Sequence, residues 1–267
     1  MKNSNDIVYN RRKQIYDILR ANGEVHIDMV AKSFGVSPLT IRRDLDHFAE
    51  RGLIERFYGG ARLVRKGPGD NIFSSPLEIN KHAIAQRAAA LVEDGDIIFI
   101  NTSSTALLML DYIQARQVTI ITNNGKALMS SIRDNLIVVL TGGEIRIPKE
   151  SMVGDFAINN LNMVTATKSF LGVSGLSVQA GITTAILQEV AINKLMLARV
   201  RGKRTVLADF TKIGQSDKFI SGDISTVDRL VTDTQADRHV LDGFREHGVE
   251  VIQVDPFQNK GSGSQRS

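Results

Sequence analysis

The sequence contains no cysteine. Disulfide bonds, thiolate metal sites and cysteine nucleophiles are therefore excluded, and a reducing compartment is expected. Long apolar runs are missing too, since none approaches the roughly 18–20 residues that cross a bilayer. The N-terminal residues Met1 to Asp6 are polar and lack the apolar core of a secretion signal. Together these absences predict a soluble, cytoplasmic protein.

Common catalytic and metal-binding motifs are also absent. Neither the G-x-S-x-G nucleophile motif nor the phosphate-binding P-loop occurs in the chain. None of the five histidines has the spacing of a metal ligand: His26, His47, His82, His239 and His247. We therefore expect no catalytic residue, no metal and no cofactor.

Positive charge is concentrated at the start of the chain. The 267 residues have a net charge of +4, but residues 1–66 alone carry 13 Lys and Arg against 8 Asp and Glu, a net charge of +5. The remaining residues have a net charge of −1. Hydrophobic residues make up 42% of the chain, an ordinary globular value. The asymmetry favours a polyanionic partner for the N-terminal segment.

Patterning divides the chain into four parts. Residues 8–64 have the pattern of three helices followed by a hairpin. A connection rich in Gly, Pro and Ser covers 65–75. Residues 76–257 alternate short β-branched runs with amphipathic stretches, which predicts an α/β domain with a largely parallel sheet. The small, polar tail at 258–267 is expected to be disordered.

Seven strands and five helices are expected in the α/β domain. The expected strands are Ile97–Ile100, Val118–Ile121, Leu136–Leu140, Ser169–Val173, Thr205–Ala208, Arg229–Val231 and Val249–Val254. The expected helices are Leu77–Val92, Ser104–Gln114, Gly125–Arg133, Ala185–Val200 and Ala236–His247. In such sheets a ligand binds beyond the carboxyl ends of the strands, so the residues after each strand are the candidates for a site.

A helix-turn-helix is predicted within residues 8–64. The first helix covers about Asn10–Ala21, and the second covers roughly Asp28–Phe34. Gly35 then allows a tight turn, and Ser37-Pro38 opens a third helix as its N-cap and first residue. A helix, a short turn with glycine and a capped helix form the layout of this motif.

The third helix is the candidate reader of DNA. Helical spacing places Ile41, Leu45, Phe48 and Ala49 on its packed side, with His47 on a flank. Its N-terminal part reaches base edges in proteins of this type, and the segment Leu53–Arg62 is expected to form a two-stranded wing. Arginines suit guanine or phosphate, although the alternative is that they only solvate the helix. The predicted DNA contacts are Ser37, Leu39, Thr40, Arg42, Arg43, Arg56, Tyr58 and Arg62.

These segments resemble the signature of the DeoR family of bacterial transcriptional regulators. F-G-V-S-P-L-T-I-R-R-D-L at Phe34–Leu45 is similar to the family's F-x-V-S-x-x-T-I-R-R-D-L. G-L-I-E-R-F-Y-G-G-A at Gly52–Ala61 is similar to its L-x-R-x-H-G-G-A, with Tyr58 in place of the histidine. His26 stands where Ser or Thr often caps the second helix. The resemblance implies an α+β multidomain regulator, most often a repressor, whose winged helix-turn-helix binds double-stranded operator DNA as a homo-oligomer.

The resemblance also implies a C-terminal sensor domain with a Rossmann-like α/β fold similar to ribose-5-phosphate isomerase and CoA-transferase enzymes. Asn101–Thr105 corresponds to the family's D-x-G-T-T, where hydroxyls and backbone N–H groups at a strand-to-helix turn form an anion cradle. A run of this kind alone is more often a plain N-cap. Asn101 replaces the common Asp and Ser103 the common Gly, so the ligand is expected to differ from that of typical members.

Further pieces of the sensor segment match family motifs. Ile121–Asn124 resembles V-T-N-S/N, Thr141–Arg146 resembles G-G-x-x-R, Gly172–Gly175 resembles G-x-x-G, and Asp209–Lys212 resembles D-x-S-K. Glu189 stands where members carry a pocket carboxylate; Lys194, one turn later, is assigned to a solvated face. The predicted effector contacts are Asn101, Ser103, Ser104, Thr105, Thr122, Asn123, Asn124, Gly142, Gly143, Arg146, Gly172, Gly175, Glu189 and Lys212.

Three functions follow from these observations as alternatives. The first is a regulator of a carbohydrate operon that responds to a phosphorylated sugar or a sugar-like metabolite. The second is a sugar-phosphate isomerase with a DNA-binding appendage, but the turn Gly172–Leu176 lacks the paired acids that move protons in such enzymes. The third is a constitutive DNA-binding protein whose sensor segment only forms oligomers.

Overall fold

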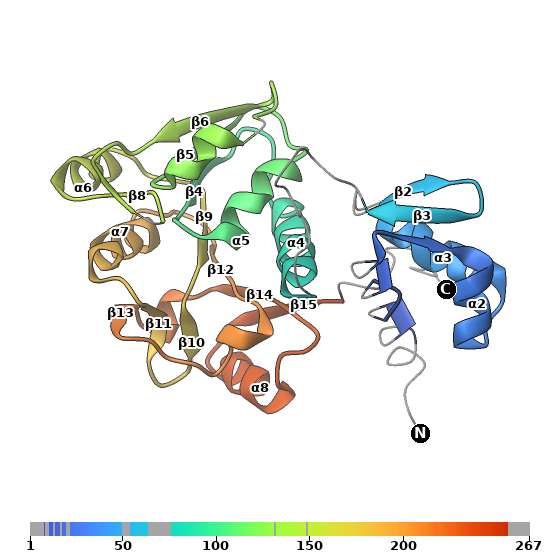
Figure 1. Cartoon of the computed structure of the whole chain (residues 1–267). Helices are drawn as coiled ribbons and strands as arrows, with labels where there is room; N and C mark the ends of the chain where they lie inside the picture. The colour runs from blue at the N-terminus through green and yellow to red at the C-terminus, as the bar shows by residue number, and fades with distance from the viewer. Residues whose placement is uncertain are drawn as a thin grey trace, which may run out of the picture. The chain divides into compact units, whose positions relative to one another are not determined.

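Figure 1 shows the computed structural model of the chain. It describes residues 8, 11–12, 14–16, 18–19, 22–49, 54–63, 76–130, 132–147 and 149–255. The chain divides into two compact units, and the division falls between Ile79 and Asn80. The expected linker at 65–75 and the expected tail at 258–267 lie outside the described residues, so the four-part division stays a prediction.

The first unit is a winged helix-turn-helix. Every described residue from 11 to 22 is helical, in agreement with the predicted first helix. The later elements are β1 (Glu24–His26), α2 (Ile27–Phe34), α3 (Pro38–Ala49), β2 (Ile54–Phe57) and β3 (Gly60–Leu63). The strands form an antiparallel sheet in the order β1-β3-β2. The predicted wing hairpin thus gains a third strand from the stretch before α2.

Local chemistry sets the ends of α2 and α3. Gly35 ends α2 in the left-handed conformation with a φ of 62°. At the start of α3 the backbone N–H of Thr40 donates to Ser37 Oγ at 3.2 Å, so the predicted N-cap is present. His26 precedes α2 without capping it, and its ring instead lies edge-on to Phe57 with centroids 5.5 Å apart.

The apolar face of α3 packs as its spacing predicts. Ile41, Leu45 and Phe48 are completely buried in the core of the first unit. His47, which was expected on a flank, is buried as well, and its ring lies edge-on to Phe48. The flank of α3 that carries His47 is therefore covered as well, and β2 is among the elements that contact α3.

A buried ion pair network joins α3 to the first helical segment. The side chain of Asp44 is 2% exposed, and its two oxygens accept hydrogen bonds from Arg11 Nε and Arg12 Nε, both at 2.6 Å. Each carboxylate oxygen therefore has its own guanidinium. Arg11 and Arg12, two of the basic residues of the N-terminal segment, are therefore paired inside the unit. They fix α3 to the first helical segment.

The second unit is built on a seven-stranded parallel sheet. Its strands are β4 (Ile97–Ile100), β5 (Val118–Thr122), β6 (Leu136–Leu140), β9 (Lys168–Gly172), β12 (Arg204–Leu207), β14 (Arg229–Asp233) and β15 (Glu250–Val254). They are ordered β15-β14-β12-β9-β4-β5-β6, and every neighbouring pair is parallel. All seven predicted strands are present, and the predicted α/β class is confirmed.

The helices agree less closely with prediction. The observed helices of this unit are α4 (Pro76–Ala89), α5 (Ser104–Leu107), α6 (Asp155–Asn162), α7 (Leu187–Ala198) and α8 (Arg238–Glu246). The stretch after α5 is a 3₁₀ helix, η1 (Leu108–Asp111), and the helix expected at 125–133 is a 3₁₀ turn, η2 (Gly125–Met129). In η2 only Ala127 is buried, so the segment lacks the apolar face that sustains a longer helix.

Several short elements escaped prediction. They are α6 and the strands β7 (Glu144–Arg146), β8 (Ser151–Val153), β10 (Gly175–Ser177), β11 (Gly181–Thr184) and β13 (Phe219–Gly222). The strands form two small sheets, a β7-β8 ribbon and a β10-β11-β13 sheet. These strands lack the continuous apolar runs that identified the strands of the large sheet.

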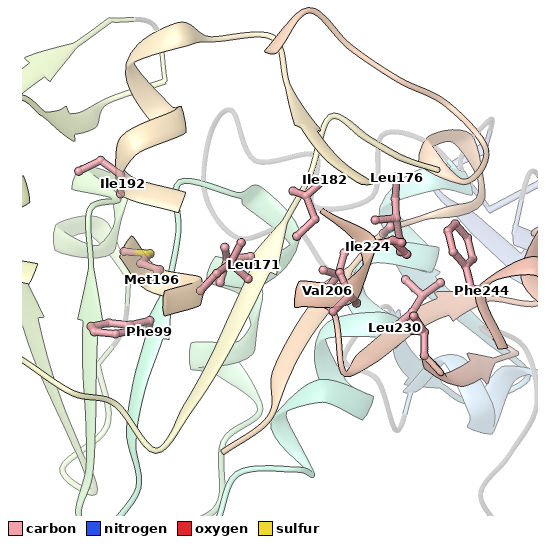
Figure 2. Packing of buried hydrophobic residues seen from close by; sticks show 14 of the residues in the cluster. Phe99, Leu171, Leu176, Ile182, Ile192, Met196, Val206, Ile224, Leu230 and Phe244 are labelled. Carbon is pink, nitrogen blue, oxygen red and sulfur yellow. The ribbon is translucent and has the colours of Figure 1, made fainter. Parts of the chain in front are cut away.

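Both faces of the large sheet are buried. In β4, Phe99 belongs to one apolar cluster, while Ile98 and Ile100 belong to another. Figure 2 shows the first cluster, in which Ile192 and Met196 of α7 and Phe244 of α8 lie over side chains of the strands. The second cluster includes the inner faces of α4 and α5. This burial on both faces explains why the strands are continuous apolar runs.

Ion pairs gather at the amino ends of the strands. Lys168 Nζ lies 2.8 Å from Asp96 Oδ2, and Arg204 Nε lies 2.8 Å from Asp228 Oδ2. Burial alone would raise the pKa of Asp96, but hydrogen bonds from Lys168, Thr167 and the Glu93 backbone hold that pKa below its ordinary value. This edge of the sheet is therefore occupied by structural pairs, which leaves the carboxyl edge for a ligand.

We predict that Asp44→Asn destabilises the first unit by about 3–5 kcal/mol, because it leaves the buried guanidinium of Arg12 and the part-buried guanidinium of Arg11 without a carboxylate. The exposed Asp46, which pairs with Arg56, is the matched control. Asp46→Asn is expected to cost less than about 1 kcal/mol. Urea unfolding followed by circular dichroism measures both variants. Equal costs for the two substitutions contradict the role given to Asp44.

Candidate functional site

The start of α3 presents an exposed polar surface. Leu39 is 55% exposed, and the side chains of Arg42 and Arg43 are exposed as well. Within the described part of the chain neither arginine has an ion pair. Ser37 and Thr40 are bonded to each other, Oγ to Oγ1 at 2.9 Å, so both hydroxyls contribute to the cap of α3. The arginines are thus the free donors of this surface.

The wing arginines have partners inside the unit. Arg56 pairs with Asp46 of α3 and also donates to the Arg42 carbonyl at 3.3 Å. Arg62 donates twice to Glu55 Oε2, at 3.0 and 3.1 Å. Exposed pairs of this kind contribute little energy and can exchange for phosphate. Tyr58, at the tip of the wing, is fully exposed.

In the second unit, Asn101 connects three elements at the carboxyl edge of the sheet. Its Nδ2 donates to the Gly172 carbonyl at 2.9 Å and to Asn193 Oδ1 at 3.0 Å, and its Oδ1 accepts from the Gly172 N–H at 2.9 Å. The side chain is 5% exposed. Its amide therefore joins β4 to β9 and to α7, and a carboxylate could not make the two donations.

The loop after β4 is tightly packed against β9. Ser103 is the N-cap of α5 and accepts from the Ala106 N–H at 3.3 Å. A Cβ at Gly172 would overlap the Ser103 side chain, so a glycine is required there. Ser104 is exposed and Thr105 is buried. Ser103 therefore has the plain N-cap role in the segment 101–105.

The residues after β5 lie beside β8. Asn123 Nδ2 donates to the Met152 carbonyl at 3.2 Å, and the Met152 N–H donates to the Asn123 carbonyl at 2.8 Å. Asn124 forms a bridge with Ser151 and caps η2 through its side chain. Thr122 is completely buried and accepts from the Asn124 N–H. This connection brings Ser151 to the carboxyl edge of the sheet.

A hollow lies between the β7-β8 ribbon and the start of α7, and we call it the α7 hollow. Its volume is about 340 Å³. It is lined by Arg146, Ile147, Lys149, Ser151, Ala185, Ile186, Leu187, Gln188 and Phe219. Of the predicted effector contacts, Arg146 is in this lining. Lys149, Ser151 and Phe219 were missed because each is an isolated residue in a segment without a recognisable pattern.

Glu189 lies beside the α7 hollow on the first turn of α7. It is 6% exposed, its Oε2 accepts from Thr184 Oγ1 at 2.8 Å, and its Oε1 lies 3.6 Å from Lys149 Nζ. Asn193, which holds Asn101, follows one turn later on the same helix. A spacing of four residues on one helix face was the signal that could have identified Asn193.

Some of the buried polar atoms without a partner lie at this edge of the sheet. Among the described residues, buried atoms without a hydrogen-bond partner include Ser151 Oγ, Asn123 Oδ1, Glu189 Oε1 and Thr102 Oγ1. Buried polar atoms are nearly always hydrogen-bonded, so each exception requires a reason. A polar ligand at this edge of the sheet would satisfy such atoms.

Four other predicted effector contacts, Gly142, Gly143, Gly175 and Lys212, are not in the lining of the α7 hollow. Gly142 and Gly143 have positive φ values of 69° and 111°, in the turn between β6 and β7. A Cβ at Gly175 would overlap the Gln215 carbonyl, so this glycine permits close packing of backbone. Lys212 is half-buried at the end of η3 (Phe210–Lys212), outside the lining of the α7 hollow.

Two carboxylates are buried at the ends of neighbouring strands β12 and β14. Asp209 accepts from the Thr211 N–H at 3.0 Å, and Asp233 accepts from the Phe210 N–H at 2.9 Å and the Gln235 N–H at 3.0 Å. Burial raises the pKa of Asp233 to about 6, and the nearby Asp209 adds to the effect. The ionised form of Asp233 is therefore disfavoured in the folded protein.

The described residues contain neither a cluster of metal ligands nor a membrane-crossing helix. No group of three or more His, Asp or Glu side chains there is arranged to hold a metal ion. None of the helices there is long and apolar enough to cross a membrane.

The chain matches two family models. Residues 11–66 match the DeoR-like helix-turn-helix domain, and residues 78–234 match the DeoR C terminal sensor domain. The lactose phosphotransferase system repressor of Streptococcus mutans is 31% identical over 85% of this chain and 92% of its own length. The glycerol-3-phosphate regulon repressor of Escherichia coli K12 is 27% identical over 90% of this chain and 97% of its own length.

Among solved structures, the second unit is similar to part of a ribose 5-phosphate isomerase from Methanocaldococcus jannaschii. The match has a TM-score of 0.37 and 19% identity, and it covers 52% of this chain and 55% of the isomerase.

We predict that Asp233 makes the stability of the second unit depend on pH. Its pKa is about 6 when folded and 3.8 when it is not buried. Well below pH 3.8 the group is protonated in both states and does not affect stability. Between pH 4 and pH 6 the unfolded state loses the proton first, so stability falls as pH rises, by about 3 kcal/mol in total.

Asp233→Asn removes this titration, because the amide is neutral at every pH. The measured quantity is the unfolding free energy of the wild type minus that of the variant, from urea titrations at pH 4 and pH 7.5. We expect the difference to be about 2 kcal/mol lower at pH 7.5 than at pH 4, because the unfolded carboxyl is already partly ionised at pH 4. Loss of one accepted hydrogen bond in the variant shifts both values equally. A difference that does not change with pH contradicts the assignment.

Proposed function

The chain belongs to the DeoR family of transcriptional regulators, and from this premise we propose that it represses a carbohydrate operon until a phosphorylated sugar or related metabolite binds its second unit. DNA binding is the function of the helix-turn-helix domain that it matches. Two relatives are named as repressors of phosphotransferase and glycerol-3-phosphate systems, which supports the metabolite class. The observation that carries the sensor role is a pair of unsatisfied buried polar atoms at the α7 hollow, Ser151 Oγ from its lining and Glu189 Oε1 beside Lys149.

The DNA contacts are proposed to be of two kinds. Arg42 and Arg43 have free guanidinium groups at the start of α3 and read base edges. Leu39 contacts bases beside them, while Ser37 and Thr40 hold the helix start in its geometry. In the wing, Tyr58, Arg56 and Arg62 contact the backbone, the last two by exchanging their present carboxylate partners for phosphate.

The effector contacts are proposed to lie along one edge of the sheet. Glu189 accepts hydrogen bonds from sugar hydroxyls through its unsatisfied Oε1, and Asn123 and Ser151 supply further polar atoms. Asn101 positions β4, β9 and α7 rather than touching the ligand, because its hydrogen bonds are already made. Ser103, Ser104, Thr105 and Lys212 remain proposed contacts at the far side of this edge.

We propose that the sensor binds its ligand without converting it. Sugar isomerisation needs a base positioned beside the carbon that loses its proton. Glu189 is engaged by Thr184 and approached by Lys149, and neither neighbour is a second carboxylate. Turnover of sugar phosphates by the purified protein would refute this part of the proposal.

We predict that Arg42→Ala and Arg43→Ala each weaken specific DNA binding about tenfold or more, since a good base contact is worth about 1–3 kcal/mol. The probe is a duplex selected from a random pool by the wild-type protein. Arg201→Ala, an exposed arginine of the second unit, is the control and is expected to bind as the wild type does. Unchanged binding by both α3 variants refutes the reader assignment.

We further propose that the protein binds this duplex as a two-fold homo-oligomer, because one α3 reads only one half-site. Sedimentation of the complex measures its stoichiometry. Two or four chains for each duplex are expected, whereas one chain for each duplex contradicts the proposal.

We predict that one or more phosphorylated three- to six-carbon sugars or polyols weaken binding to the selected duplex. Fluorescence anisotropy measures the DNA affinity with each compound and with its unphosphorylated parent. Glu189→Gln is expected to bind DNA as the wild type does but to lose most of the response, because a neutral amide is a weaker acceptor for sugar hydroxyls. Absence of any response across the panel favours a constitutive regulator instead.

A further inference from the structure

Two cations border the α7 hollow from the β7-β8 connection. Arg146 has only Glu144 as an ion-pair partner among the described residues, at 3.9 Å and largely exposed. Lys149 Nζ approaches Glu189 Oε1 at 3.6 Å, and that oxygen still has no hydrogen-bond partner. Both cations therefore retain N–H donors for another group. The loop 101–105, where the family motif places the anion cradle, contains no cation.

The N-terminus of α7 opens at the same hollow. Leu187 and Gln188, its first residues, line the hollow, and Ile186 before them offers no side-chain cap. The first N–H groups of a twelve-residue helix carry partial positive charge and attract anions. The helix after β4 is both shorter and capped, since α5 has four residues and its N-cap is Ser103.

A buried hydroxyl without a partner completes the lining. Ser151 is 0% exposed, its Oγ has no hydrogen-bond partner, and the residue lines the hollow. A hydroxyl in this state is expected to meet a polar group of a ligand, because leaving it unpaired costs about 1–3 kcal/mol. This observation is independent of the helix and of the two cations.

We propose that the α7 hollow binds the phosphate group of the effector. Arg146 and Lys149 neutralise the dianion, the backbone N–H groups of Leu187 and Gln188 donate to its oxygens, and Ser151 donates from the lining of the hollow. The proposal rests on the proposed function for the class of effector. It deepens that function by moving the phosphate from the loop 101–105 to the start of α7. Glu189 then holds an adjacent hydroxyl while Lys149 turns to the phosphate.

Inorganic phosphate is the probe that tests the subsite. Calorimetric titration of the full-length protein at pH 7.5 and constant ionic strength gives its affinity. Arg146→Gln and Lys149→Gln are each expected to weaken it about tenfold, the value of one charge-assisted hydrogen bond. Lys149→Arg keeps the charge and is expected to bind within about twofold of the wild type. Lys194→Gln, an exposed lysine on the same helix, is the matched control and should change nothing.

Three results overturn the subsite. One is wild-type affinity in both glutamine variants. Another is loss of phosphate binding in Ser104→Ala, with retention in Arg146→Gln, which places the phosphate in the loop after β4. The third is a wild-type protein that binds no phosphate at tens of millimolar. Circular dichroism of each variant shows that a loss of binding is not a loss of fold.

The subsite and the proposed function fail separately. If sugar phosphates change DNA affinity equally in the wild type and in Lys149→Gln, the function stands and the subsite is wrong. If phosphate binding depends on Arg146 and Lys149 but no sugar phosphate changes DNA affinity, the subsite stands and the effector class is wrong. The anisotropy and calorimetry measurements together distinguish these cases.

Discussion

Buried polar groups must find partners, and in both units this constraint fixes the element that carries the candidate site. Asp44 takes α3 into the core only because Arg11 and Arg12 meet its two oxygens. Asn101 is buried only because Gly172 and Asn193 satisfy its amide. Each network is costly to break and therefore holds its geometry. The exposed arginines of α3 and the lining of the α7 hollow depend on these two anchors.

The two edges of the parallel sheet differ in their polar groups. At the amino ends of the strands, the charged groups pair with each other, as in Lys168 with Asp96 and Arg204 with Asp228. At the carboxyl ends, Asp233 keeps a raised pKa and Ser151 and Glu189 have atoms without partners. Such unfavourable features persist where a ligand repays them. The topology favours this edge as the place for a ligand, and the local chemistry of the chain agrees.

Sequence predicted what long patterns and specific motifs determine. The seven sheet strands, the cap at Ser37 and the buried face of α3 follow from periodicity and capping rules. Short elements such as the β7-β8 ribbon were not predictable, because Glu144–Arg146 and Ser151–Val153 contain neither a continuous apolar run nor an alternation long enough to recognise. Lys149 was missed for that reason, since only the ribbon brings it to Glu189. Asn101 was predicted as a contact because motif matching identifies a position and not the partners of its side chain.

Regulation of DNA binding by an effector imposes one more condition on this chain. An effector that binds equally well to the DNA-bound and the free protein changes nothing, however tightly the α7 hollow holds it. Linkage is also reciprocal: if the effector weakens operator affinity by some factor, the operator weakens effector affinity by the same factor. The ion pair between Lys149 and Glu189 can therefore take part in regulation only if its geometry differs between the DNA-bound and the free protein. Phosphate affinity measured with and without DNA decides this point, because only a subsite coupled to α3 changes its affinity when the duplex is added.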